Sequence, residues 1–258
     1  IVGAGYTGLS AAITLARAGR SVAVFDKMRP GEGASTRNGG IASGNLTPSF
    51  QQLIDKLGQD RAQAIQAEAR AAREDLMQFI RAENLACDFA LTGRFTGASN
   101  AGDYDRLARE ADLLSKHIGV DAYALPRAEQ KAALGTDFYH GGLVRMDIGG
   151  LHPAKFHAEM LRVALAAGAT VHGETAVLKI TRTGSGFTLD TARGRVTARD
   201  VIMGTNGYTD GVAPSLRRRI IPIGSYIIAS EPLPEELAQE ISPKGRSFFD
   251  TKNFLYYW

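Results

Sequence analysis

The feature that most limits what this chain can fold into is a glycine-rich turn within its first eight residues. Residues 3–8 read Gly-Ala-Gly-Tyr-Thr-Gly, the pattern Gly-x-Gly-x-x-Gly, and they follow the apolar pair Ile-Val. The pattern beyond them predicts a helix over 9–18 and a second strand over 21–25, directly before Asp26. A β-α-β unit that binds a dinucleotide has this order of turn, helix, strand and acid. The sequence therefore predicts a parallel sheet with a diphosphate-binding turn.

Each glycine of this pattern has a physical role. Gly3 permits the tight turn, Gly5 lets the backbone approach a pyrophosphate, and Gly8 lets the helix pack close to the strand. The helix N-terminus offers free N–H groups and about half a positive charge to the phosphates. An ordinary strand-to-helix turn is the alternative interpretation, and the acid after the second strand favours the dinucleotide site.

Composition excludes several other classes of protein. The 258 residues carry a formal net charge of only +3, which gives no indication of a nucleic-acid partner. No apolar run approaches the roughly 18 residues of a membrane span, and we predict no metal site. Cys87 is the only cysteine, so an internal disulfide is impossible and a reducing, cytoplasmic location is expected.

The middle of the chain predicts a second kind of substructure. Thr47 precedes a proline and is the predicted N-cap of a helix. Apolar spacing predicts a long helix over 60–83 and another over 104–117. Strands are predicted over 88–95 and 138–147.

Two later segments distinguish between dinucleotide enzymes. A nicotinamide-dependent dehydrogenase would share the opening turn, but it would not need the Gly-Ala-Ser-Thr-Arg-Asn-Gly-Gly segment at 33–40. The chain also has a helix that opens with His152-Pro153, a strand that ends in Gly-Thr-Asn-Gly at 204–207, and Pro222, Ser225, Pro232 and Leu233 further on. With the opening turn, these segments resemble the glycine/D-amino-acid oxidase (DAO) family of FAD-dependent oxidoreductases. The resemblance is closest to the branch that contains γ-glutamylputrescine oxidoreductase.

The resemblance implies an α/β fold with an α+β substrate part. A Rossmann-like FAD-binding β-α-β domain would comprise 1–46 and 150–221. A substrate domain of helices and mixed or antiparallel strands would comprise 47–149 and 222–258 and be incomplete. Because only two residues precede the first glycine, and the family continues into a second glycine-rich segment, we expect the chain to be truncated at both ends and to hold FAD poorly.

The resemblance also implies which residues contact FAD. Asp26 stands where these flavoproteins usually carry Glu, and it would still reach the adenosine ribose directly or through water. Segment 35–44 has no histidine or cysteine to tether a flavin, so FAD is expected to be non-covalent. A polar surface loop and a buried strand edge are the alternatives for the later contacts. The predicted contacts are Gly3, Gly5, Tyr6, Thr7, Gly8, Asp26, Lys27, Ser35, Thr36, Arg37, Asn38, Gly39, Gly40, Ile41, Val177, Gly204, Thr205 and Asn206.

The implied reaction is the oxidation of a carbon–nitrogen bond in a small amine or amino acid. Hydride passes to flavin N5, the imine is hydrolysed to a carbonyl compound and an amine or ammonia, and O2 or another acceptor reoxidises the flavin. No catalytic residue is assigned, and the oligomeric state is not predicted. Aromatic candidates for the substrate cavity are Tyr226, Tyr256, Tyr257 and Trp258. A dehydrogenase with a non-oxygen acceptor, or an inactive half that binds a partner subunit, are the alternatives.

Overall fold

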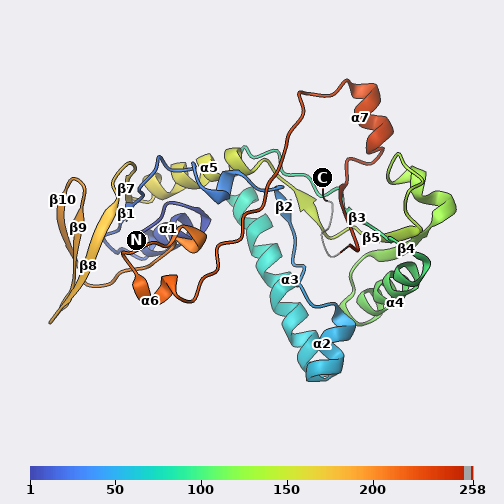
Figure 1. Cartoon of the computed structure of the whole chain (residues 1–258), viewed down its shortest axis with the longest axis horizontal. Helices are drawn as coiled ribbons and strands as arrows, with labels where there is room; N and C mark the ends of the chain where they lie inside the picture. The colour runs from blue at the N-terminus through green and yellow to red at the C-terminus, as the bar shows by residue number, and fades with distance from the viewer. Residues whose placement is uncertain (253–256, 258) are drawn as a thin grey trace. The chain divides into compact units, whose positions relative to one another are not determined.

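The computed structural model describes residues 1–252 and 257, which form two compact units (Figure 1). Each unit is assembled from three separate stretches of the chain, so the chain passes between the units several times. The first unit comprises Ile1–Asn38, Leu85–Cys87 and Pro153–Ile228, and the second comprises Gly39–Asn84, Asp88–His152 and Ala229–Trp258.

A small parallel sheet organises the first unit. Strand β1 (Ala23–Phe25) pairs in parallel with β7 (Thr170–His172). On the other side of β1, Val2 forms a parallel bridge with Phe25 and a further parallel bridge with Met203. The order is therefore β7, β1, Val2, Met203, which confirms the parallel arrangement expected for the opening β-α-β unit.

Two helices of the first unit pack against each other. Helix α1 (Tyr6–Arg17) begins immediately after Gly5, three residues earlier than predicted, because the second glycine of the turn is itself the N-cap. Helix α5 (Pro153–Ala166) begins at the predicted His-Pro position. The two helices are in contact, and each buries an apolar face. This pairing holds the glycine turn between the sheet and α5.

An antiparallel meander completes the first unit. Strands β8 (Val177–Thr183), β9 (Gly186–Thr191) and β10 (Gly194–Ala198) form a sheet of order β10-β9-β8 (Figure 1). Val177 and Leu189 of this sheet are buried in one hydrophobic cluster with Val2 and Phe25. The short elements of the unit are η1 (Ala34–Thr36), η3 (Asn206–Tyr208) and α6 (Pro214–Arg217).

A four-stranded mixed sheet organises the second unit. Its order is β11-β3-β5-β4, with β11 parallel to β3 and the other pairs antiparallel. The strand predicted over 88–95 begins six residues too early, since Asp88 has a positive φ of 54°, Ala90 makes only an isolated bridge to Gly150, and the strand starts at Arg94. The strands are β3 (Arg94–Gly97), β4 (Ala122–Pro126), β5 (Gly141–Arg145) and β11 (Ser247–Asp250).

Helices cover and extend this sheet. Helix α4 contacts β4 and β5, and α2, α3 and α4 contact one another. Phe50, Leu53 and Leu114 are buried in a core among these helices, while Phe95 and Phe248 are buried in a second core against the sheet. The remaining elements are α2 (Phe50–Leu57), α3 (Gln59–Ala82), α4 (Ala101–Ile118), η2 (Arg127–Ala132), α7 (Glu235–Ile241) and the pair β2 (Ile41–Ala42) and β6 (Gly149–Gly150).

The start of α2 corrects the predicted N-cap. The cap is Ser49, not Thr47, because Ser49 forms a capping box with Gln52. The Ser49 hydroxyl oxygen accepts a hydrogen bond from the Gln52 amide at 3.2 Å, and the Gln52 side-chain oxygen accepts one from the Ser49 amide at 2.8 Å. Two amide groups at the start of the helix are thus satisfied reciprocally.

The substitution Ser49→Ala should lower the free energy of unfolding by about 1 kcal/mol, because it removes the capping acceptor. Thr47→Ala is the matched control and should leave stability unchanged. Urea unfolding of both variants measures the difference. Equal losses, or a larger loss for Thr47→Ala, would contradict the position of the cap.

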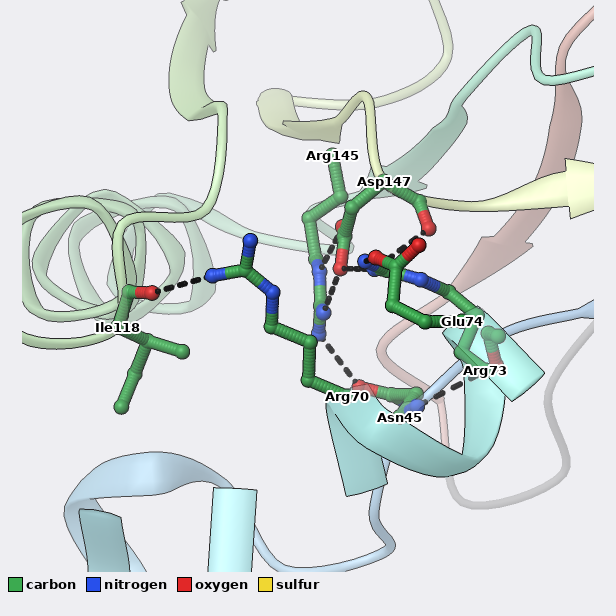
Figure 2. Close-up of polar contacts among 8 residues, drawn as sticks. Asn45, Arg70, Arg73, Glu74, Ile118, Arg145 and Asp147 are labelled. Carbon is green, nitrogen blue, oxygen red and sulfur yellow. Dashed lines mark hydrogen bonds and ion pairs between the residues drawn. The ribbon is translucent and has the colours of Figure 1, made fainter. Parts of the chain in front are cut away.

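A buried ion cluster links α3 to the end of β5 (Figure 2). Arg73 approaches the Asp147 carboxylate to 2.5 Å, and Arg145 donates two hydrogen bonds to the same carboxylate at 3.0 and 2.9 Å. Arg73 also pairs with Glu74, whose side chain is half exposed, and Arg145 donates to Asn45 at 2.7 Å. Burial opposes ionisation of Asp147, but the hydrogen bonds and charges of the arginines outweigh it and hold the pKa of this carboxyl below its ordinary value.

The substitution Asp147→Asn should cost about 3 kcal/mol of stability at pH 7, because two buried guanidinium groups lose their shared carboxylate. A lowered carboxyl pKa adds stability that is complete above the ordinary value of 3.8 and disappears as the pH falls through the folded-state pKa. The difference between the two proteins should therefore shrink below about pH 4.

Chemical unfolding at a series of pH values tests this expectation. Glu74→Gln is the control, and it should have a much smaller effect because the Glu74 side chain is half exposed. A difference that stays constant from pH 7 to acid pH would contradict the assigned direction of the Asp147 pKa.

Candidate dinucleotide-binding crevice

A cavity of about 320 Å³ opens in the first unit where the chain leaves its parallel strands. The wall is formed by the glycine turn, the residues after β1, the η1 segment, one face of α5, the start of β8 and the loop after Met203. Twelve of its lining residues are predicted cofactor contacts. These are Gly3, Gly5, Tyr6, Thr7, Asp26, Lys27, Ser35, Asn38, Val177, Gly204, Thr205 and Asn206.

Backbone contacts explain two glycines of the turn. Gly3 has a φ of +102°, and a Cβ atom there would lie 2.7 Å from the Gly204 carbonyl oxygen. A Cβ atom on Gly8 would lie 1.8 Å from the Gly3 carbonyl oxygen. A side chain at Gly3 would therefore displace the Gly204 segment, and a side chain at Gly8 would push α1 away from the turn.

The N-terminus of α1 presents unused hydrogen-bond donors to the crevice. The Tyr6 amide donates to the Ser35 hydroxyl oxygen at 3.0 Å. Among the described residues, the amides of Gly5 and Thr7 have no hydrogen-bond partner, and both residues line the crevice. Free amides with the positive end of the helix dipole favour an anion at this point.

The Asp26 carboxylate turns toward the glycine turn. Its Oδ2 atom accepts a hydrogen bond from the Ala4 amide at 2.8 Å, and its Oδ1 atom accepts one from the Met28 amide at 2.9 Å. The side chain thus fixes the turn at the same time as it lines the crevice. Each carboxylate oxygen has further lone pairs, so Asp26 remains able to accept a hydrogen bond from a ligand hydroxyl.

His157 is a crevice residue that sequence reasoning missed. It lies on α5, is only 3% exposed, and its Nε2 atom is 2.7 Å from the Ala4 carbonyl oxygen. Since a carbonyl only accepts, this contact assigns the proton to Nε2. The residue sits among Phe156 and Met160 on the buried face of the helix, so nothing in its pattern distinguishes it from a packing residue.

Tyr6 anchors the turn to the start of α5. Its hydroxyl donates to the Pro153 carbonyl oxygen at 3.1 Å, and its ring meets Phe156 edge-on at a centroid distance of 5.3 Å. Burial raises the pKa of Tyr6, which keeps the hydroxyl protonated as the donor.

The segment 31–38, which follows β1, is held by hydrogen bonds between its own residues. The Thr36 hydroxyl donates to the Gly31 carbonyl oxygen at 2.5 Å, and the Asn38 side-chain amide donates to the carbonyl oxygens of Ala34 and Ser35 at 3.1 and 3.0 Å. These bonds place Ser35 beside α1. Arg37 is exposed and does not line the crevice.

Lys27 and Asp210 line the crevice and form an ion pair with each other. The Lys27 ammonium is 3.5 Å from the Asp210 carboxylate and 3.4 Å from the Tyr208 carbonyl oxygen. Because the Lys27 and Asp210 side chains are each about half exposed, this pair is open to exchange with solvent or ligand charges.

The structure does not bring all predicted site residues into this crevice. Gly8 and Thr36 support it from outside its lining, Tyr226 is 91% exposed in the first unit, and Tyr257 lies beside Gly39 in the second unit. Tyr256 and Trp258 lie outside the described residues. The predicted contacts Gly39, Gly40 and Ile41 belong to the second unit.

In the part of the chain that the structure describes, no helix is both long enough and apolar enough to cross a membrane. No three His, Cys, Asp or Glu side chains gather there in a way that could hold a metal ion.

Comparison with known proteins places the chain among flavoenzymes. The family model described as "DAO: FAD dependent oxidoreductase" matches residues 1–257. The chain is 30% identical over 263 residues to the Haemophilus influenzae protein named Probable oxidoreductase OrdL, covering all of the chain and 61% of the relative. It is also 30% identical over 262 residues to γ-glutamylputrescine oxidoreductase of Escherichia coli K12, covering all of the chain and 60% of that protein. The chain thus spans about 60% of the length of these curated relatives.

A solved structure shares the fold. Glycine oxidase from Geobacillus kaustophilus matches with a TM-score of 0.69 at 22% sequence identity, over 83% of this chain and 56% of that one. This likeness supports the mixed α/β architecture predicted from the opening β-α-β unit.

The substitution Asp26→Asn should lower the free energy of unfolding by about 2 kcal/mol, because one of two amide donors then faces an NH2 group instead of a carboxylate oxygen. Asp210→Asn removes a carboxylate from the exposed side of the same crevice and should change stability little. Thermal unfolding of the two variants gives the comparison. If Asp26→Asn unfolds at the wild-type temperature, Asp26 does not fix the turn.

Proposed function

The chain belongs to the DAO family of FAD-dependent oxidoreductases, and we propose that its crevice binds the ADP part of FAD in an enzyme that oxidises a carbon–nitrogen bond of an amine or amino acid. One observation supports this proposal above all. At the N-terminus of α1, the backbone amides of Gly5 and Thr7 have no hydrogen-bond partner among the described residues, and both residues line the crevice. Free amides at a helix N-terminus bind anions, and phosphate groups are the anionic part of FAD.

The charges of the crevice support a diphosphate held by the backbone. Lys27 is the only lysine or arginine in the crevice wall among the described residues, and it is paired with Asp210. Neutralisation would therefore come from the amides and the helix dipole. Ser35 adds a donor, since its hydroxyl oxygen accepts from the Tyr6 amide and its O–H is left to bind a phosphate oxygen.

The adenosine end would lie toward β1 and β8. Asp26 and Lys27 follow β1, and Val177 begins β8 with its side chain buried in the adjoining core. An apolar wall beside a carboxylate suits an adenine ring next to ribose hydroxyls. Gly204, Thr205 and Asn206 line the crevice on the side where Gly204 packs against Gly3.

We propose that the flavin part of FAD contacts residues that do not line this crevice. The residues proposed to contact or support the flavin are Gly8, Thr36, Arg37, Gly39, Gly40 and Ile41.

The proposed domains remain an FAD-binding part at 1–46 and 150–221 and a substrate part at 47–149 and 222–258. Tyr226, Tyr256, Tyr257 and Trp258 remain the proposed aromatic wall of the substrate cavity.

The chemistry would be divided between cofactor and protein. Bound, non-covalent FAD supplies a two-electron acceptor for a hydride from the substrate carbon next to nitrogen. The residues of this chain bind and orient its diphosphate and ribose, and none of them is assigned as a general base. We include in the proposal O2 or another acceptor as the final oxidant, and a reducing cytoplasmic location, which fits the single, buried cysteine Cys87.

Titration of the purified chain with FAD, FMN and ADP tests the proposed cofactor site. FAD should bind weakly and ADP should displace it, because both carry the diphosphate and adenosine, whereas FMN should not compete. Ser35→Ala should weaken FAD binding about ten-fold through loss of a hydrogen bond to a charged group. Ser10→Ala, on the exposed side of α1, is the control.

Turnover of a panel of amines and amino acids, by a protein that carries the complete substrate domain, then tests the reaction. Peroxide formation would identify an oxidase, and reduction of only an artificial dye would identify a dehydrogenase. FAD binding without turnover of any C–N substrate would contradict the proposed activity and leave the cofactor site standing. Equal competition by FMN would contradict the cofactor site itself.

A further inference from the structure

An unpaired cation lies buried in the sheet of the second unit. Arg94, the first residue of β3, is only 5% exposed. Its Nε atom is enclosed and has no hydrogen-bond partner, and no hydrogen bond or ion pair found among the described residues involves its guanidinium group. The ring of Phe249 lies 4.0 Å from the guanidinium carbon, which supports the apolar face of the group but leaves its N–H donors unused.

The nearby carboxylate is already committed to other arginines. Arg145 is the cross-strand neighbour of Arg94, and it shares Asp147 with Arg73 (Figure 2). Glu74 pairs with Arg73. Arg73 and Arg145 thus have ion pairs with Asp147 or Glu74, whereas no ion pair between described residues involves Arg94.

Burial weakens the charged form of Arg94. Loss of solvent, followed by the charge of Arg145, lowers the pKa of Arg94 to about 9. The charge of Asp147 favours the protonated form but does not outweigh these two effects, so the folded chain carries a buried charge that is only partly offset. Such a charge is costly unless a partner neutralises it.

A second unpaired polar atom belongs to the residue that pairs with Arg94 on the neighbouring strand. Ser247 of β11 is directly opposite Arg94 in the parallel register, so the two side chains share one face of the sheet. The Ser247 hydroxyl oxygen is enclosed and also has no hydrogen-bond partner. A guanidinium fork and a hydroxyl side by side provide several donors for one planar anion.

We propose that Arg94 and Ser247 form a binding site for the carboxylate of a small molecule. One carboxylate oxygen would accept from the guanidinium group and the other from the Ser247 hydroxyl. The site goes beyond the proposed FAD function and does not depend on it, because all its residues belong to the second unit.

Acetate is the probe for this site. Saturation-transfer NMR on the full chain should show acetate binding at a constant ionic strength set with sodium chloride. Arg94→Met should weaken acetate binding at least about ten-fold, since it removes a charged hydrogen-bond donor. Arg94→Lys keeps the charge but not the fork and should recover only part of the affinity. Ser247→Ala should weaken binding less than Arg94→Met.

The unfolding temperature of Arg94→Met shows whether Arg94 has a binding role or a structural one. Arg94→Met should unfold at or above the wild-type temperature, because it removes a buried unpaired charge and keeps a contact with the Phe249 ring. Arg106→Met is the matched control, as Arg106 is half exposed and pairs with Asp103; it should leave acetate binding unchanged.

Several results would contradict the proposal. Undiminished acetate binding by Arg94→Met, or no acetate binding by the wild-type chain, would exclude the site. If Arg94→Met does not fold, Arg94→Lys replaces it in the binding measurement. Ser247→Ala then gives the independent measurement, and unchanged acetate binding by that variant would exclude the hydroxyl.

Discussion

The first unit depends on a contact between backbone segments. The start of α1 lies so close to the ends of the parallel strands that Gly8 meets the Gly3 carbonyl, and Gly3 in turn meets the Gly204 carbonyl. No side chain fits between these segments, so the three glycines bring a helix N-terminus to the place where the strands end. The free amides of the crevice follow from this packing, because a helix start always leaves donors without an internal partner.

Side chains then fix the turn in a single geometry. The Ala4 amide donates to Asp26 and the Ala4 carbonyl oxygen is bound by His157, so the residue between the first two glycines is held from both sides. An aspartate suits this role, because its short side chain reaches the turn while its carboxylate still lines the crevice. The same carboxylate thus supports the turn and remains available to a ribose hydroxyl.

The sequence predicts well what depends on local pattern and poorly what depends on distant contacts. The glycine turn and the long helix α3 follow from spacing, and the predicted bounds of α3 are within one residue. Ser49 displaced Thr47 as N-cap because only Ser49 has Gln52 three residues later. His157 and Arg94 could not be predicted, since each acquires its environment from residues far away in the chain: Ala4 for His157, and Arg145, Ser247 and Phe249 for Arg94.

In the proposed binding mode, the first turn of α1 holds two linked phosphates through its backbone amides. Amide hydrogen exchange with and without ADP, resolved at single residues, measures this directly. Binding through Gly5 and Thr7 should slow exchange of these two amides selectively, while amides of the β8–β9 hairpin exchange as before. Unchanged exchange at the turn under saturating ADP, with protection elsewhere, would show that the diphosphate binds at another place.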